Sequence, residues 1–242
     1  QTRLQPAETR AEMKDDQNSV LGVVRELCEN VVAKEASGVD RERRFPRRSL
    51  QALADAGLWG LTVPKLFHGL GWGAQEFVRV LETVAQSCGS TAMVYLMHVS
   101  ATMPIVAVGS DEQRSRWLPE IAAGRVLATL SFSEPGSGAH FYAPVSRASA
   151  NEDGFMLNCE KSFVTSAGEA DLYLVSTGSA AGSTPLESDL FLVSRDRSGL
   201  EVRGRWEGLG LNGNASSPMR FHDVKLTVRD RIGAEKSGLS TM

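Results

Sequence analysis

The segment best suited to bind a ligand is a run of hydroxyl residues that leads into glycines. Residues 130–140 read LSFSEPGSGAH, with Gly136 and Gly138 close behind the serines. Glycines let backbone N–H groups and neighbouring hydroxyls reach a ligand without bulky side chains in the way. This arrangement suits an anionic or carbonyl-rich ligand, although a plain inter-domain turn would have the same composition.

A second segment, KSFVTSA at residues 161–167, places a ring and a hydroxyl at alternate positions. In a β-strand, Phe163 and Thr165 would point to the same face. One surface would then offer an aromatic ring for stacking and a hydroxyl for hydrogen bonding. A strand of the hydrophobic core is the competing interpretation of these residues.

Two other patterns carry less chemistry. Residues 208–213 read GLGLNG and fit GxGxxG, but no helix pattern follows them, so no helix N-terminus is available to hold a pyrophosphate. Residues 69–73 (GLGWG) are interpreted as a surface turn before a helix. The cysteines Cys28, Cys88 and Cys159 lie far apart without metal-site spacing, and we expect them to be buried. No metal site is predicted.

The elements that must position these segments change type near Gly124. Before it, apolar residues recur at helical spacing, and Ser90 and the Ser110/Gln113 pair are predicted to cap helices. After it, short alternating runs predict strands at 126–132, 145–150, 155–159, 172–176, 190–193, 200–203, 219–221 and 224–226. The predicted fold is α+β and multidomain, with an N-terminal α-helical bundle followed by a mostly antiparallel β-barrel or sandwich. The expected domains are 1–124, 125–234, and 235–242 as the start of a further helical domain.

Composition narrows the function classes. Hydrophobic residues make up 42% of the 242 residues, as in an ordinary globular chain. Lys and Arg (26) against Asp and Glu (29) give a net charge of −3, which argues against nucleic-acid binding. No uninterrupted apolar run approaches the roughly 20 residues needed to span a bilayer, and no signal peptide is recognisable. The three scattered cysteines, without paired spacing, predict a reducing, cytoplasmic location.

Six motifs occur in one order along the chain: WGLTVP at 59–64, GLGW at 69–72, GSDEQ at 109–113 with WLP at 117–119, SEPGSG at 133–138, KSFVT at 161–165 and FHDVK at 221–225. Together they resemble the N-terminal helical and middle β-domains of acyl-CoA dehydrogenases. The resemblance implies FAD held without a Rossmann fold. It also implies α,β-desaturation of an acyl-CoA thioester, with the Cα proton passing to a Glu base and the Cβ hydride to flavin N5.

The resemblance also assigns residues. Those expected to contact the flavin are Leu130, Ser131, Phe132, Ser133, Gly138, Ala139, Phe163, Val164 and Thr165. Among them, Ser133 would bond the pyrimidine edge of the ring and the Thr165 hydroxyl would lie near N5. Ala139 and His140 stand where the family usually has Ser or Thr and then Asp, and they are candidates for substrate contact. Phe163 stands where Trp is frequent.

The family's catalytic Glu belongs to a C-terminal domain, and no residue of this chain is expected to replace it. Expected partners are an acyl-CoA substrate, an electron-transfer flavoprotein or other acceptor, and either further copies of the chain or a partner chain that brings the C-terminal domain. Two alternatives stay open: a flavin-dependent monooxygenase of the same fold, and a non-catalytic subunit or half of a split enzyme.

Overall fold

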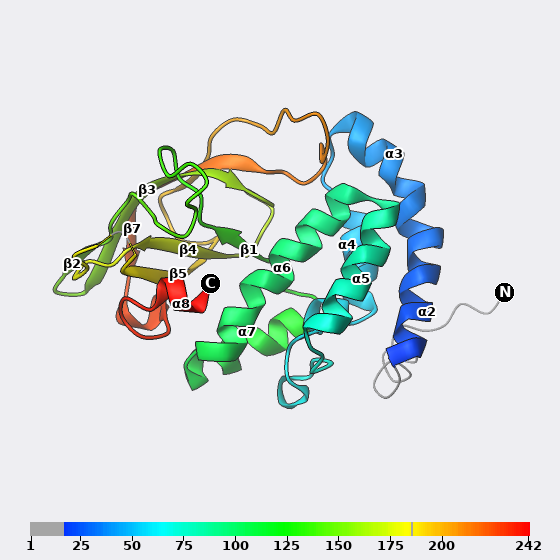
Figure 1. Ribbon diagram of the computed structural model, residues 1–242, viewed down its shortest axis with the longest axis horizontal. Coiled ribbons are helices and arrows are strands. Elements are labelled where there is room, and N and C mark those ends of the chain that lie inside the picture. The colour runs from blue at the N-terminus through cyan, green and yellow to red at the C-terminus, as the bar shows by residue number, and fades with distance from the viewer. Residues whose placement is uncertain (1–16, 185) are drawn as a thin grey trace.

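The computed structural model describes residues 17–184 and 186–242, which form a helical half and a β half side by side (Figure 1). The main helices are α2 (Gln17–Leu27), α3 (Ala33–Glu42), α4 (Arg47–Asp55), α5 (Ala74–Ser87), α6 (Gly89–Val108) and α7 (Asp111–Ala122). A π-helical turn, Cys28–Val32, joins α2 to α3, and short 3-10 turns lie at Leu58–Gly60 and Lys65–Phe67. The change from helix to strand falls between Ala122 and Ala128, near the change of period in the sequence.

The predicted helix starts are partly correct. Ser110 and Gln113 form the expected capping box at the start of α7. Ser90, in contrast, is not a cap: α6 begins at Gly89, and the Ser90 hydroxyl instead accepts a hydrogen bond from the backbone N–H of Gly213 at 3.1 Å. A serine near a helix start indicates a cap, but here a distant loop takes that hydroxyl as its partner.

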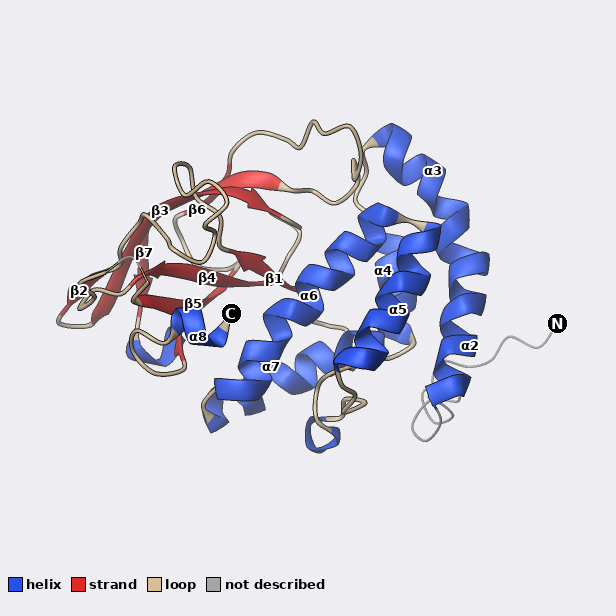
Figure 2. Cartoon of the chain, viewed as in Figure 1, coloured by secondary structure: helices blue, strands red, loops and turns tan. Residues whose placement is uncertain are grey.

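Helix α6 is the central helix of the molecule, lying against α5 and against the first strand (Figure 2). Its 20 residues are apolar on nearly every side, and by length and composition alone it could cross a membrane. More than half of that stretch is buried within the protein, which is also the pattern of a core helix.

Over the residues that the structure describes, the β half consists of two four-stranded sheets. One has the order β1-β4-β5-β8, from Ala128–Ser131, Leu172–Gly178, Ser188–Ser194 and Arg231–Ile232. The other has the order β2-β3-β7-β6, from Ser149–Asn151, Gly154–Val164, Ser217–Leu226 and Leu200–Val202. The strands pair antiparallel except for β1 with β4, and two isolated parallel bridges join Arg147 to Gly178 and Ser188 to Ser237. A 3-10 turn, η4 (Val228–Asp230), precedes β8, and a short helix, α8 (Gly238–Thr241), follows it.

The two sheets do not close into a barrel over the described residues, so the sandwich form of the prediction is the one observed. The three cysteines are free and buried, as expected. The GLGLNG loop leads into β7, so it lacks the following helix whose N-terminus a dinucleotide-binding turn uses.

The halves are joined by a shared core and by a buried histidine. His98 of α6 is fully buried; its Nε2 donates to the Trp59 carbonyl (3.2 Å), and its Nδ1 accepts from the N–H of Ala128 (3.0 Å). Because the Ala128 N–H can only donate, the ring must be neutral with its proton on Nε2. One side chain thus links α6 directly to the first residue of β1.

The GLGWG segment precedes α5 as predicted, but its first two residues are buried rather than on the surface. Gly69 is buried, and a Cβ there would overlap the carbonyl oxygen of Val63. We expect Gly69→Ala to lower the free energy of unfolding by about 1–3 kcal/mol, because the backbone of Val63 has to move. Gly22→Ala on the exposed side of α2, where a Cβ has open space, is the control and should be neutral or slightly stabilising. Urea unfolding midpoints compare them, and equal midpoints would contradict the close approach.

Candidate functional site

A pocket of about 440 Å³ lies where α6 meets the ends of β1 and β3. The β half contributes Leu130, Phe132, Ser133, Phe163 and Thr165, and the helix contributes Met97, Ser100 and Pro104; Phe141 and Met242 complete the lining. Mostly apolar walls with a few hydroxyls suit a flat ring with a polar edge, and the volume lies in the range of small-molecule sites. No carboxylate is among these lining residues.

The sequence-predicted flavin residues divide into three groups. Leu130, Phe132, Ser133, Phe163 and Thr165, from two separate segments, line the pocket together. Ser131 and Val164 are buried and are not among the lining residues. Gly138 and Ala139 lie on an exposed loop outside the lining, together with the substrate candidate His140, whose ring contacts Tyr142 edge-on at 5.7 Å. The structure therefore does not bring the two substrate candidates into this pocket.

Phe163 and Thr165 both line the pocket but differ in burial. Phe163 is 65% exposed and meets the ring of Trp206 edge-on at 6.1 Å. Thr165 is buried, with its hydroxyl 2.9 Å from the hydroxyl of Ser216. The expected ring and hydroxyl thus face one space, although Thr165 lies just beyond the last residue of β3.

The loop that carries Ser133 is anchored by a buried ion pair that sequence reasoning missed. Lys161, with a fully buried side chain, contacts Glu134 at 2.7 Å. Its ammonium also donates to the carbonyls of Phe132 (3.1 Å) and Ser176 (2.6 Å). The Glu134 carboxylate accepts from the backbone N–H groups of Val145 (2.6 Å) and Ser146 (2.7 Å) and from the Ser146 hydroxyl. Glu134 therefore ties the start of the loop to its end.

The surroundings of Glu134 favour its charged form. Burial by itself would raise the pKa of Glu134, but the Lys161 ammonium and the hydrogen bonds from Ser146 outweigh it and hold that pKa below its usual range. Glu134 belongs to the SEPGSG motif and Lys161 to the KSFVT motif. The only sign of an ion pair in the sequence was that each motif carries one charge, of opposite sign, next to a predicted strand. Their pairing was not predictable because they are 27 positions apart.

Comparison with known proteins decides the family. The model of the acyl-CoA dehydrogenase N-terminal domain matches residues 14–125, and that of the middle domain matches residues 129–224. The chain belongs to the acyl-CoA dehydrogenase family. The expected resemblance is thereby confirmed, and the two matched domains correspond to the helical and the β half.

Individual relatives in the acyl-CoA dehydrogenase family are distant. The cyclohex-1-ene-1-carbonyl-CoA dehydrogenase of Syntrophus aciditrophicus is 27% identical over 240 residues; the alignment covers 99% of this chain and 58% of that protein. Among solved structures, an acyl-CoA dehydrogenase from Geobacillus kaustophilus has a TM-score of 0.86 at 22% identity, covering 94% of this chain and 60% of that one. The FAD complex of the Bacillus anthracis enzyme has a TM-score of 0.85 at 23% identity, covering 93% and 39%. The chain therefore spans less than two thirds of each.

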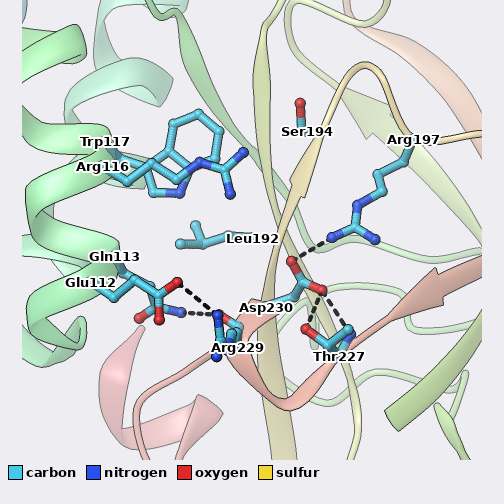
Figure 3. A pocket seen from close by; sticks show the side chains of 10 residues that line it. All are labelled: Glu112, Gln113, Arg116, Trp117, Leu192, Ser194, Arg197, Thr227, Arg229 and Asp230. Carbon is cyan, nitrogen blue, oxygen red and sulfur yellow. Dashed lines mark hydrogen bonds and ion pairs between the residues drawn. The ribbon is translucent and has the colours of Figure 1, made fainter. Parts of the chain in front are cut away.

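A smaller cavity of about 190 Å³ lies between α7, the end of β5 and the turn before β8 (Figure 3). Charged groups in it are largely paired: Arg197 with Asp230 at 2.7 Å, and Arg229 with Glu112 at 3.3 Å. The Gln113 amide donates to the carbonyls of Arg229 (2.8 Å) and Arg231 (3.0 Å). This acyl-CoA dehydrogenase-family chain thus uses these contacts to fix α7 to the last strand.

Proposed function

We propose that the chain forms the FAD-binding part of an acyl-CoA dehydrogenase and that the pocket between α6, β1 and β3 holds the isoalloxazine ring. The observation that carries the proposal is the convergence of Leu130, Ser133, Phe163 and Thr165 on one apolar space. The family membership supports it, as does the FAD complex of the related Bacillus anthracis enzyme. When bound, FAD supplies the hydride acceptor for α,β-desaturation of an acyl-CoA thioester.

The pocket residues have separable roles in this proposal. Leu130, Phe132 and Phe141 exclude water from the ring and keep the local dielectric low. The hydroxyls of Ser133 and Thr165 offer neutral hydrogen-bond donors at the polar edge, where charge accumulates during reduction. The proton from Cα has no carboxylate acceptor in the lining, so we propose that a Glu outside residues 1–242 receives it. Electrons would leave to an electron-transfer flavoprotein or a similar acceptor.

The direct test is a titration of the purified chain with FAD, followed by the fluorescence and visible absorption of the flavin. Saturable uptake with a shifted visible spectrum is the expected result. A chain that takes up no FAD would contradict the proposal and favour a non-catalytic subunit with the same fold. Turnover of acyl-CoA with an artificial acceptor by the chain alone would contradict the placement of the base.

Thr165→Ala is expected to weaken FAD binding by roughly three- to tenfold, the usual worth of one neutral hydrogen bond. The thermal midpoint without FAD should fall modestly, because Ser216 loses its hydroxyl partner while the backbone of Thr165 keeps its bond from the Thr129 hydroxyl at 2.7 Å. Thr83→Ala in α5, which removes a hydroxyl bonded to its own helix, is the matched control. Equal FAD affinities in the wild type and Thr165→Ala would remove the proposed role of this hydroxyl.

A further inference from the structure

The hydroxyl of Thr165 does not stand alone in the pocket wall. The Oγ of Ser216 lies 2.9 Å from Thr165 Oγ1, and either hydroxyl can be the donor. Both side chains are about 6% exposed, so water competes little for this bond. Only Thr165 of the two lines the pocket, which leaves Ser216 one layer behind it.

Ser216 is itself held in place by its neighbours. Its backbone N–H donates to the side-chain oxygen of Asn214 at 2.9 Å, and Asn214 is 2% exposed. The backbone carbonyls of Asn214 and Ala215 accept from the N–H groups of Ser166 and Ala167, each at 3.0 Å. Residues 214–216 therefore clamp the turn that follows β3, with Ser216 fixed opposite Thr165.

Hydrogen-bond counting sets the direction of this pair. Each hydroxyl has a single proton to donate. If Thr165 donates to Ser216, its proton is used and an acceptor in the pocket goes without a donor. If Ser216 donates to Thr165, the Thr165 proton is free for that acceptor and its O–H bond is further polarised. With an acceptor in the pocket, the second arrangement makes one more hydrogen bond.

We propose that Ser216 is a positioning residue: it donates to Thr165 Oγ1 and so turns the Thr165 O–H towards the pocket. The inference rests on the proposed flavin site, whose oxidised ring presents hydrogen-bond acceptors. By this inference, residues 214–216, which precede β7, increase the affinity for FAD although they do not line the pocket.

The test is a double-mutant cycle on FAD affinity in the full 242-residue chain, with Ser216→Ala, Thr165→Ala and the double variant. Ser216→Ala should weaken FAD binding by roughly three- to tenfold in the presence of Thr165 and have little effect in its absence. Ser216→Thr restores the hydroxyl and should recover most of the affinity and the visible spectrum. Ser217→Ala, at the next residue of the chain, is the matched control and should leave the affinity within about twofold.

The outcomes separate the two proposals. Equal effects of Ser216→Ala with and without Thr165, or no rescue by Ser216→Thr when that variant has the wild-type thermal midpoint, would overturn the positioning role and leave the flavin site standing. An unsubstituted chain that binds no FAD would overturn the flavin site and this inference together. Circular dichroism of each variant shows whether a loss of FAD affinity comes from unfolding. If Ser216→Ala is unfolded, the FAD affinity of Ser216→Thr is the measurement that tests the positioning role.

Discussion

Replacing Lys161 by Met is expected to lower the free energy of unfolding by about 3–5 kcal/mol and to abolish measurable FAD binding. The side chain of Lys161 is fully buried against Glu134, so its removal leaves a carboxylate inside the protein without its counter-charge. Glu134, which ties the two ends of the loop from Ser133 to Ser146, would lose its counter-charge, and the carbonyl of Phe132 at the start of the loop would lose its hydrogen bond from the ammonium. Denaturant unfolding and FAD titration measure the two effects.

Two variants make this expectation specific. Lys225→Met, which changes an exposed lysine on the neighbouring strand β7, should shift stability by less than about 0.5 kcal/mol. The double change Lys161→Met with Glu134→Leu should recover part of the lost stability, because no unpaired charge remains buried. An unchanged unfolding midpoint in Lys161→Met would show that the ion pair does not stabilise the fold.

Acid should weaken the protein through His98, in a pH range set by its burial. Desolvation lowers the pKa of His98 to about 4, while the bond to the Trp59 carbonyl and the nearby Asp171 only partly oppose that effect. Between about pH 6.5, where the histidine of the unfolded chain takes its proton, and about pH 4, only the unfolded state is protonated. Stability is therefore complete above this window and falls by about 1.4 kcal/mol per pH unit within it, about 3 kcal/mol in all.

His98→Gln isolates this contribution, because a neutral amide offers both an acceptor and a donor but does not titrate. The difference in unfolding free energy between wild type and variant should change with pH only inside that window. Carboxylates such as Glu134, whose lowered pKa also removes stability in acid, contribute equally to both proteins and cancel. A constant difference from pH 4 to 7 would show that His98 is not a buried neutral base.

Much of the fold could be predicted because local signals agreed with the tertiary structure. The Ser110/Gln113 pair marks the start of α7, and the change from helical to alternating spacing marks where β1 begins. Features that depend on distant partners were not predictable in this way. Ser90 resembles a cap until Gly213 takes its hydroxyl, and Gly69 resembles a surface residue until Val63 packs against it.

The candidate site shows the same division. Phe163 and Thr165 were predicted to share a face because a strand fixes that geometry locally, and both line the pocket. The charged pair of Glu134 with Lys161 and the hydroxyl pair of Thr165 with Ser216 join segments 27 and 51 residues apart, so neither was visible as a pattern. Ala139 and His140 followed the family motif, but their loop carries them outside the pocket.

Because the pocket is lined by a helix on one side and by strands on the other, any molecule bound there contacts both halves of the chain at once. Its binding free energy therefore adds to the free energy that holds the two halves together in the folded state. Occupancy should accordingly raise the melting temperature of helices and sheets together, as a single cooperative transition.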